Sequence, residues 1–135
     1  MQARDIMTTS IQSVESDATV AEIMRLMAGK MIRSVVVKPR DTQDMLGVVA
    51  VRDVVNKVLA KGLEPKKVAA GDVATKPLFC VKGDMDVRHL MSLMQNYNIA
   101  RVFVTDGGEI VGVVALMDFI KASVKGFGDA KPSSS

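Results

Sequence analysis

The chain has 135 residues, of which 48% are hydrophobic and 24% are charged. This composition is typical of one domain-sized globular protein and excludes an intrinsically disordered chain. The net charge of +3, from 18 basic and 15 acidic residues, is too small to indicate a nucleic-acid partner.

No apolar run approaches the roughly 20 residues that a membrane-spanning helix needs, and the charged start of the chain opens no signal peptide. The single cysteine, Cys80, excludes an internal disulfide and a zinc site built on several cysteines. We therefore expect a cytoplasmic protein without a membrane partner.

The first predicted elements follow one another between residues 11 and 60. A short strand over residues 11–14 precedes a helix that Thr19 and Glu22 begin as a capping box. The apolar stripe of this helix has the spacing i, i+3, i+4, i+7, i+11 and consists of Val20, Ile23, Met24, Met27 and Met31. Two apolar runs, 35–37 and 46–51, predict strands, the second buried on both faces. A short helix closes the segment with Val54, Val55, Val58 and Leu59.

The same order returns in the rest of the chain. A strand over 78–81 precedes a helix capped by Asp86, with an apolar stripe of Val87, Leu90, Met91 and Met94. Strands over 102–104 and 110–116 flank the hairpin signal Asp106-Gly107-Gly108. A closing helix carries Phe119, Ile120 and Val124.

The recurrence is a sequence repeat. When the chain is shifted by 67 residues, residues 3–38 lie over 70–105 and twelve of 36 positions are identical. The offset then becomes 65, because the polar loop 39–44 absorbs a length change at little energetic cost, and Gly47–Ala50 matches Gly112–Ala115.

These patterns predict an α+β fold of two β-α-β-β-α units, at residues 3–62 and 68–126, followed by a flexible tail over 127–135. A unit of about 60 residues supplies a marginal core, and its strands are apolar on both faces. We expect the two units to pack sheet to sheet with pseudo-twofold symmetry, leaving related clefts between them.

The motifs of this repeat resemble the CBS domain, named after cystathionine β-synthase. They are Asp5-Ile6-Met7-Thr8 and the run from Gly47 to Asp53, repeated as Asp72-Val73-Ala74-Thr75 and the run from Gly112 to Asp118. The resemblance covers almost the whole chain and implies a tandem pair, or Bateman module, that forms a homodimer. It also implies an adenosine-containing ligand, such as AMP, ADP, ATP or S-adenosylmethionine, bound between the copies.

The resemblance makes Asp53 and Asp118 candidates for the ribose, because a carboxylate accepts hydrogen bonds from both ribose hydroxyls. The alternative is that each is a helix N-cap. Candidate phosphate donors are Arg33, Arg52 and Arg101, which would otherwise be solvated strand-end residues. The adenine wall would be Ile32, Ile99 and Phe79, with Met7 as a further member; the alternative is that they are core residues.

In the family the clefts are shared between the copies. Asp53 would be joined by residues of the other copy, namely Phe79, Ile99 and Arg101. Asp118 would be joined in the same way by Gln12, Ile32, Arg33 and Ser34.

The sequence departs from the nucleotide-binding pattern at Ala50 and Ala115, where serine or threonine is usual, and at Met117, which supplies no phosphate donor beside Asp118. A lost hydroxyl costs on the order of 1 kcal/mol of binding. Because Arg52 supplies a phosphate donor beside Asp53 whereas Met117 supplies none beside Asp118, we expect the Asp53 cleft to bind better than the Asp118 cleft.

No catalytic constellation is present, because the only histidine, His89, is expected on the surface and Cys80 in a buried strand. The prediction is a stand-alone, non-enzymatic regulatory module that requires no cofactor or metal. It would take an adenine nucleotide as its regulatory ligand and signal to an effector protein through its shape or dimer packing. The alternative is a structural or protein-interaction module with degenerate, non-binding clefts.

Overall fold

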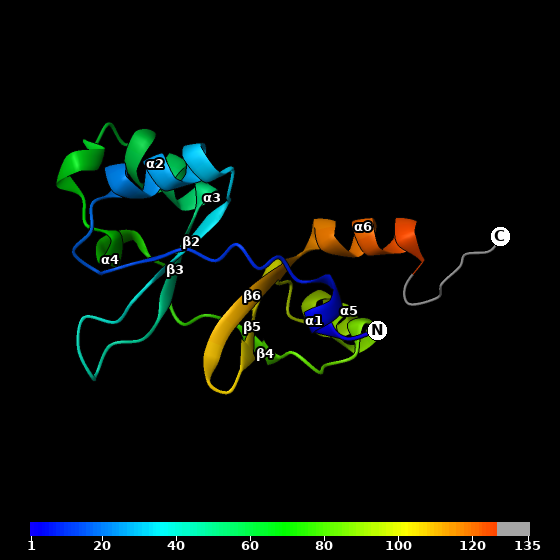
Figure 1. Cartoon of the computed structure of the whole chain (residues 1–135). Coiled ribbons are helices and arrows are strands. Elements are labelled where there is room, and N and C mark those ends of the chain that lie inside the picture. The colour runs from blue at the N-terminus through cyan, green and yellow to red at the C-terminus, as the bar shows by residue number, and fades with distance from the viewer. Residues whose placement is uncertain (127–135) are drawn as a thin grey trace. The chain divides into compact units, whose positions relative to one another are not determined.

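The computed structural model describes residues 1–126, and the predicted tail over 127–135 lies outside the described residues. Figure 1 shows the course of the chain. In chain order the elements are α1 (Ala3–Ile6), β1 (Ser13–Val14), α2 (Val20–Lys30), β2 (Ser34–Val37), β3 (Gly47–Ala50), α3 (Val51–Val54), the π-helix η1 (Val55–Leu59), the 3-10 helix η2 (Pro65–Lys67), α4 (Ala70–Val73), β4 (Cys80–Lys82), α5 (Val87–Asn96), β5 (Arg101–Asp106), β6 (Glu109–Ala115) and α6 (Leu116–Lys125). The predicted α+β class and the repeated β-α-β-β-α order are confirmed.

The chain forms two compact units. The first unit is Ile11–Leu78, and the second unit combines Met1–Ser10 with the chain from Phe79 onward. Each unit holds one three-stranded sheet, ordered β1-β2-β3 in the first and β4-β5-β6 in the second. In both, the first pair of strands is parallel and the second pair is antiparallel.

Each sheet packs its inward side chains against its own helices. In the first unit the core is built mainly of valines from β2 and β3 together with Val20 and Ile23 of α2. In the second unit Leu90 and Met94 of α5 pack with valines of β5 and β6 and with Phe119 of α6. Apart from Met31, the residues of the predicted helix stripes lie in these two cores or pack against them, and the cores are mainly aliphatic.

Helices α2 and α5 begin at the predicted N-caps, and of the capping box predicted for α2 the bond to Thr19 is observed. The Thr19 hydroxyl accepts a hydrogen bond from the Glu22 backbone N–H at 3.2 Å, and the Asp86 carboxylate accepts from Arg88 N–H at 3.0 Å and His89 N–H at 3.3 Å. The hairpin between β5 and β6 turns through Gly107 and Gly108, whose φ angles are +59° and +83°, as its glycine pair predicts.

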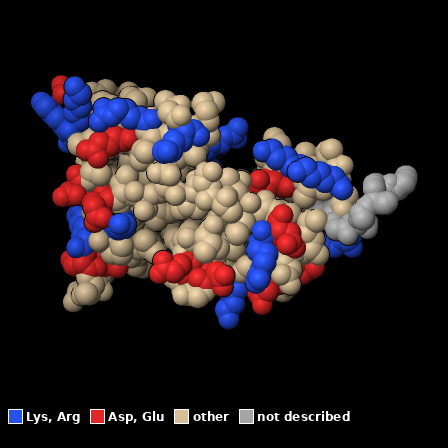
Figure 2. Space-filling model, viewed as in Figure 1, with Lys and Arg blue, Asp and Glu red and all other residues tan. Residues whose placement is uncertain are grey.

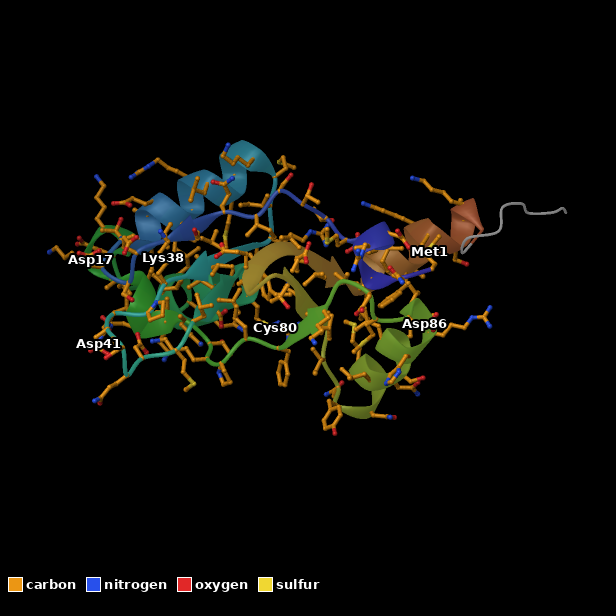
Figure 3. All side chains as sticks on the ribbon, turned by 60° about the horizontal axis from the view of Figure 1, so that its bottom comes forward. Met1, Asp17, Lys38, Asp41, Cys80 and Asp86 are labelled. Carbon is orange, nitrogen blue, oxygen red and sulfur yellow. The ribbon has the colours of Figure 1, made fainter. Side chains whose placement is uncertain are left out.

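The segments that precede the first strand of each repeat fold with the other repeat. In the second unit, Ala3 N–H donates to Met85 C=O at 2.8 Å, and Val87 N–H at the start of α5 donates to Met1 C=O at 2.9 Å. Figure 3 labels Met1 and the N-cap residue Asp86. In the first unit, the equivalent Ala70 N–H donates to Ala18 C=O at 2.7 Å. The compact units therefore do not coincide with the sequence repeats, because the segment before the first strand of each repeat belongs to the unit of the other repeat.

Two expectations about single side chains are wrong. Met31 does not extend the α2 stripe, because the helix ends there in the left-handed conformation (φ 55°) and the side chain is 86% exposed. Cys80, labelled in Figure 3, is exposed rather than buried, because in β4 only Val81 points into the core. Partial desolvation nevertheless raises the pKa of the Cys80 thiol.

Among residues 1–126, no helix is long and apolar enough to cross a membrane. On the face shown in Figure 2, basic and acidic side chains are interspersed rather than gathered into fields of one sign.

Candidate functional site

Two aspartates occupy equivalent strand-to-helix junctions, one in each unit. Asp53 is the third residue of α3, and Asp118 is the third residue of α6. The backbone N–H of the residue before each helix donates to the aspartate Oδ2 at 2.8 Å, from Ala50 to Asp53 and from Ala115 to Asp118. The N-caps are thus the alanines, and each carboxylate supplies the returning half of a capping box.

The second oxygen of each carboxylate faces a threonine. Thr75 Oγ1 donates to Asp53 Oδ1 and Thr8 Oγ1 donates to Asp118 Oδ1, both at 3.4 Å. Hydroxyl-to-oxygen hydrogen bonds are usually 2.7–2.8 Å long, so these contacts are weak. A better-placed hydroxyl could therefore replace either threonine contact.

The threonines reach the carboxylates because the segments around Thr8 and Thr75, which fold with the other repeat, each pair with the last strand of that repeat's sheet. Thr75 forms an antiparallel bridge with Val48, as Thr8 does with Val113. The glycine before each of these valines makes the approach feasible. A Cβ on Gly47 would lie 2.9 Å from Lys76 Cγ.

The same packing holds in the second unit, where a Cβ on Gly112 would lie 2.8 Å from Met7 Cγ. Met7 also packs against the core of that unit. Gly47 and Gly112, the first residues of the two longer motifs, therefore allow a neighbouring segment to pack closely against the strand. In the second unit Met7 is the residue that packs there.

The two junctions differ in charge. Lys57, four residues after Asp53, places Nζ 3.0 Å from Asp53 Oδ1 and donates a hydrogen bond to Val73 C=O at 3.0 Å. The position equivalent to Lys57 is Ala122, which is buried beside Phe119 on α6. The α6 helix therefore supplies no cation to Asp118 from this position.

The predicted basic residues lie at strand ends or at the start of α3, and the strand register places them at the same end of each sheet as the carboxylates. Arg33 and Arg52 are exposed in the first unit, where Val51 N–H donates to Arg33 C=O at 3.0 Å. Arg101 is partly buried at the start of β5 and pairs in register with Ala115, the residue before α6.

The remaining predicted site residues are also distributed between the two units. In the first unit Ser34 pairs with Ala50, and Gln12 C=O accepts from Val36 N–H at 2.9 Å. Ile32 packs on the core of the first unit, just as Ile99 packs on that of the second.

Phe79 is 56% exposed beside β5, where its carbonyl accepts from Phe103 N–H at 2.8 Å. The predicted site residues can now be sorted into two sets, one in each unit, whose members lie near the ends of strands or at the start of the closing helix. Gln12, Ile32, Arg33, Ser34, Arg52 and Asp53 form the first-unit set, and Phe79, Ile99, Arg101 and Asp118 form the second-unit set.

Three functional candidates went unrecognised in the sequence. Thr8 and Thr75 are identical across the repeat and end two of its motifs, but nothing local links them to aspartates 110 and 22 residues away. The spacing of Lys57 from Asp53 predicts an i,i+4 ion pair, although the bond from Lys57 to Val73 is visible only in the structure.

A polar cluster fastens the Thr75 segment to the first unit. Lys76 Nζ lies 2.7 Å from Asp44 Oδ1, and Arg40 N–H donates to Asp44 Oδ2 at 2.8 Å. The hydrogen bond from Lys76, followed by that from the Arg40 backbone, lowers the pKa of Asp44 from its usual 3.8 to about 2. Arg40 also contacts Asp72 at 2.8 Å. This cluster holds the segment that positions Thr75.

Two hollows of about 530 Å³ lie on the helical sides of the units. One is between α5 and α6, with Ile99 and Met117 on its wall; the other lies between α2 and the linker around Pro65. Within residues 1–126, no three His, Cys, Asp or Glu side chains are grouped so that they could hold a metal ion.

Comparison with known proteins agrees with this architecture. The CBS-domain profile matches residues 3–60 and 70–125. An uncharacterized protein of Methanopyrus kandleri is 32% identical over 119 residues, which are 87% of this chain and 58% of that protein. Hypoxic response protein 1 of Mycobacterium tuberculosis is 27% identical over 88% of this chain and 82% of its own.

Among solved structures, the hexameric CBS-CP12 protein from bloom-forming cyanobacteria superposes with a TM-score of 0.83 at 30% identity, covering 97% of this chain and 76% of that one. The chain spans only 58% and 59% of two archaeal relatives, from Methanopyrus kandleri and Methanocaldococcus jannaschii. The double profile match, the repeated fold and the paired junctions together show that this chain belongs to the CBS-domain family and carries two CBS domains in tandem.

Proposed function

We propose that the chain is a non-catalytic regulatory module that binds an adenosine-containing ligand at its aspartate junctions. AMP, ADP, ATP and S-adenosylmethionine are the candidate ligands. The ligand would shift the module between two arrangements or dimer packings, which an effector protein would read. Regulation of this kind requires that the ligand bind the two arrangements with different affinities. It requires no chemical step.

The duplicated carboxylate and threonine arrangement carries this proposal. At both junctions one carboxylate oxygen is bound to the backbone at 2.8 Å, and the other faces a threonine hydroxyl at 3.4 Å. At Asp53 this second oxygen also pairs with Lys57 Nζ at 3.0 Å. A ribose hydroxyl that approaches Oδ1 at about 2.7 Å would replace the weak threonine bond with a strong, charge-assisted one. Within each unit, the nearby arginines could bind phosphate and the isoleucines could contact adenine.

Isothermal titration calorimetry with the four candidate ligands tests the proposal. The informative variants are Asp53→Asn and Asp118→Asn, because the amide oxygen can still accept from Ala50 or Ala115 and preserve the helix start. Saturable binding of one ligand, weakened about tenfold or more by one of these variants through loss of a charge-assisted bond, is the expected result.

Asp5→Asn is the matched control, because Asp5 Oδ2 also accepts the N-cap backbone N–H of a helix at 2.8 Å, from Gln2. It removes one capping charge of the same kind from α1. Equal weakening by Asp5→Asn, or saturable binding that neither junction variant changes, would count against the aspartate site.

An interaction module is the second candidate, and one specific observation favours it. The closing helical segments expose the same apolar stripe at i, i+4 and i+8 in both units, formed by Val51, Val55 and Leu59 and by Leu116, Ile120 and Val124. Matching exposed stripes of this kind suit self-association with a second copy of the chain.

Sedimentation equilibrium separates the two candidates. If the stripes mediate assembly, Val55→Lys and Ile120→Lys should each reduce self-association because they place a charge on an apolar contact surface. Stripe-dependent assembly in the absence of any calorimetric response would identify an interaction module without a ligand.

A further inference from the structure

We infer that the hollow between α2 and the linker over residues 61–67 docks an acidic, amphipathic helix of a partner protein. The hollow has a volume of about 530 Å³ and is lined entirely by residues of the first unit, among them Met24 and Ala28 of α2 and Pro65 of η2. Neither aspartate junction contributes a residue to its lining. The inference is therefore independent of the proposed ligand binding.

The apolar lining of the hollow follows one face of α2. Ala21, Met24 and Ala28 line it at the spacing i, i+3, i+7, which extends along the helix for about 10 Å. The two alanines have small side chains, so a second helix can approach α2 closely here. Met24 is only partly buried, and its flexible side chain can adapt to those of a partner. A helix with apolar residues at i, i+3 or i+4, and i+7 matches this length and spacing.

The rim of the hollow is basic. Arg25 and Lys66 line it and are exposed, and within residues 1–126 neither forms an ion pair. The acidic lining residue, Glu64, already pairs with Lys67 at 3.7 Å. Together α2 and the linker carry five basic and two acidic residues, and this net +3 equals the net charge of the whole chain. Carboxylates of a partner therefore complement this rim better than basic or neutral side chains do.

The second unit does not repeat this combination of small side chains and basic rim. The α5 residues at the positions of Ala21 and Ala28 are Arg88 and Gln95, which are larger and exposed. The docking features thus belong to the first unit alone. The repeat also supplies a natural substitution for the test, because Ala28→Gln introduces the residue that the second copy has at this position.

Fluorescence anisotropy tests the inference with a labelled helical peptide of about 15 residues, which carries leucines on one face and glutamates on its flanks. This peptide should bind saturably, and a counterpart with lysines for glutamates about tenfold more weakly. Arg25→Gln combined with Lys66→Gln should weaken the glutamate peptide about tenfold, because two exposed ion pairs are lost. The matched control is Lys121→Gln combined with Lys125→Gln, which removes the same charge from exposed positions of α6 and should leave the affinity within about twofold.

Ala28→Gln should weaken the glutamate peptide several-fold, because the longer side chain occupies the hollow; circular dichroism checks that this variant is folded. Equal affinities for the two peptides, unchanged binding in the Arg25 and Lys66 variant, or no binding by the unmodified protein would each overturn the inference. It would also be overturned if Ala28→Gln reduced self-association in sedimentation equilibrium without peptide, because the hollow would then hold a second copy of the chain.

Discussion

Replacing Asp53 by alanine tests whether this carboxylate stabilises the fold as well as offering an acceptor to a ligand. The substitution removes the acceptor for Ala50 N–H at 2.8 Å and the ion pair with Lys57 at 3.0 Å. It also removes the 3.4 Å contact with Thr75. All three partners belong to the first unit, so the loss is local to the start of α3.

The magnitude follows from these contacts. A hydrogen bond to a charged acceptor contributes about 1.5 kcal/mol at the lower end of its range. The ion pair adds about 0.5 kcal/mol, because the Lys57 side chain is 43% exposed and water screens such pairs. The Thr75 contact is too long to add a comparable amount. Asp53→Ala should therefore lower the free energy of unfolding by about 2 kcal/mol.

Urea denaturation followed by circular dichroism measures this loss, and hydrogen exchange at the Ala50 amide reports it locally. Asp53→Asn, which retains an acceptor for Ala50, should lose less than half as much. A double-mutant cycle with Lys57→Met should give a coupling of about 0.5 kcal/mol. An Asp53→Ala variant as stable as the unmodified protein, with unaltered exchange at Ala50, would refute the capping role derived from the structure.

Three further predictions concern stability. Met31→Gly should raise the free energy of unfolding by about 1 kcal/mol in urea titrations, because Met31 is exposed and left-handed (φ 55°); a destabilised variant would contradict this. Ala115→Ser should stabilise α6 by about 1 kcal/mol, seen as a higher urea midpoint, because this N-cap has extended backbone and no capping side chain. Stability should fall as the pH drops from about 4 to about 2, because the pKa of Asp44 is lowered from 3.8 to about 2 in the folded state and the unfolded chain binds protons first; in Asp44→Asn this part of the pH dependence of unfolding should disappear.

The local elements could be predicted because short-range patterns encode them. The caps Thr19 and Asp86, the stripe residue Leu90 and the hairpin glycines all behave as their spacing indicates. The prediction that Met31 belongs to the apolar stripe of α2 was wrong for a local reason, which apolar periodicity does not record. It continues the apolar spacing of α2, yet the helix ends there in a left-handed turn.

The sequence identified Asp53 and Asp118 as candidate site residues, but it did not identify Thr8, Thr75 and Lys57, which contact them. The repeat marked Asp53 and Asp118 as equivalent, and the structure places both at the third position of a helix. Cys80 shows the limit of strand patterns, because alternation predicts two faces without saying which one is buried.

The sequence by itself determined that this protein is a tandem repeat of β-α-β-β-α units, because apolar periodicity, caps and turn residues act over a few positions and recur at a fixed offset. Only the tertiary structure decided that the segments around Thr8 and Thr75 fold with the opposite repeat and meet the aspartates there. That choice depends on long-range strand pairing and on the space beside Gly47 and Gly112, which no local pattern records. The bond from Lys57 to Val73, and with it the fixed charge at the Asp53 junction, has the same long-range origin.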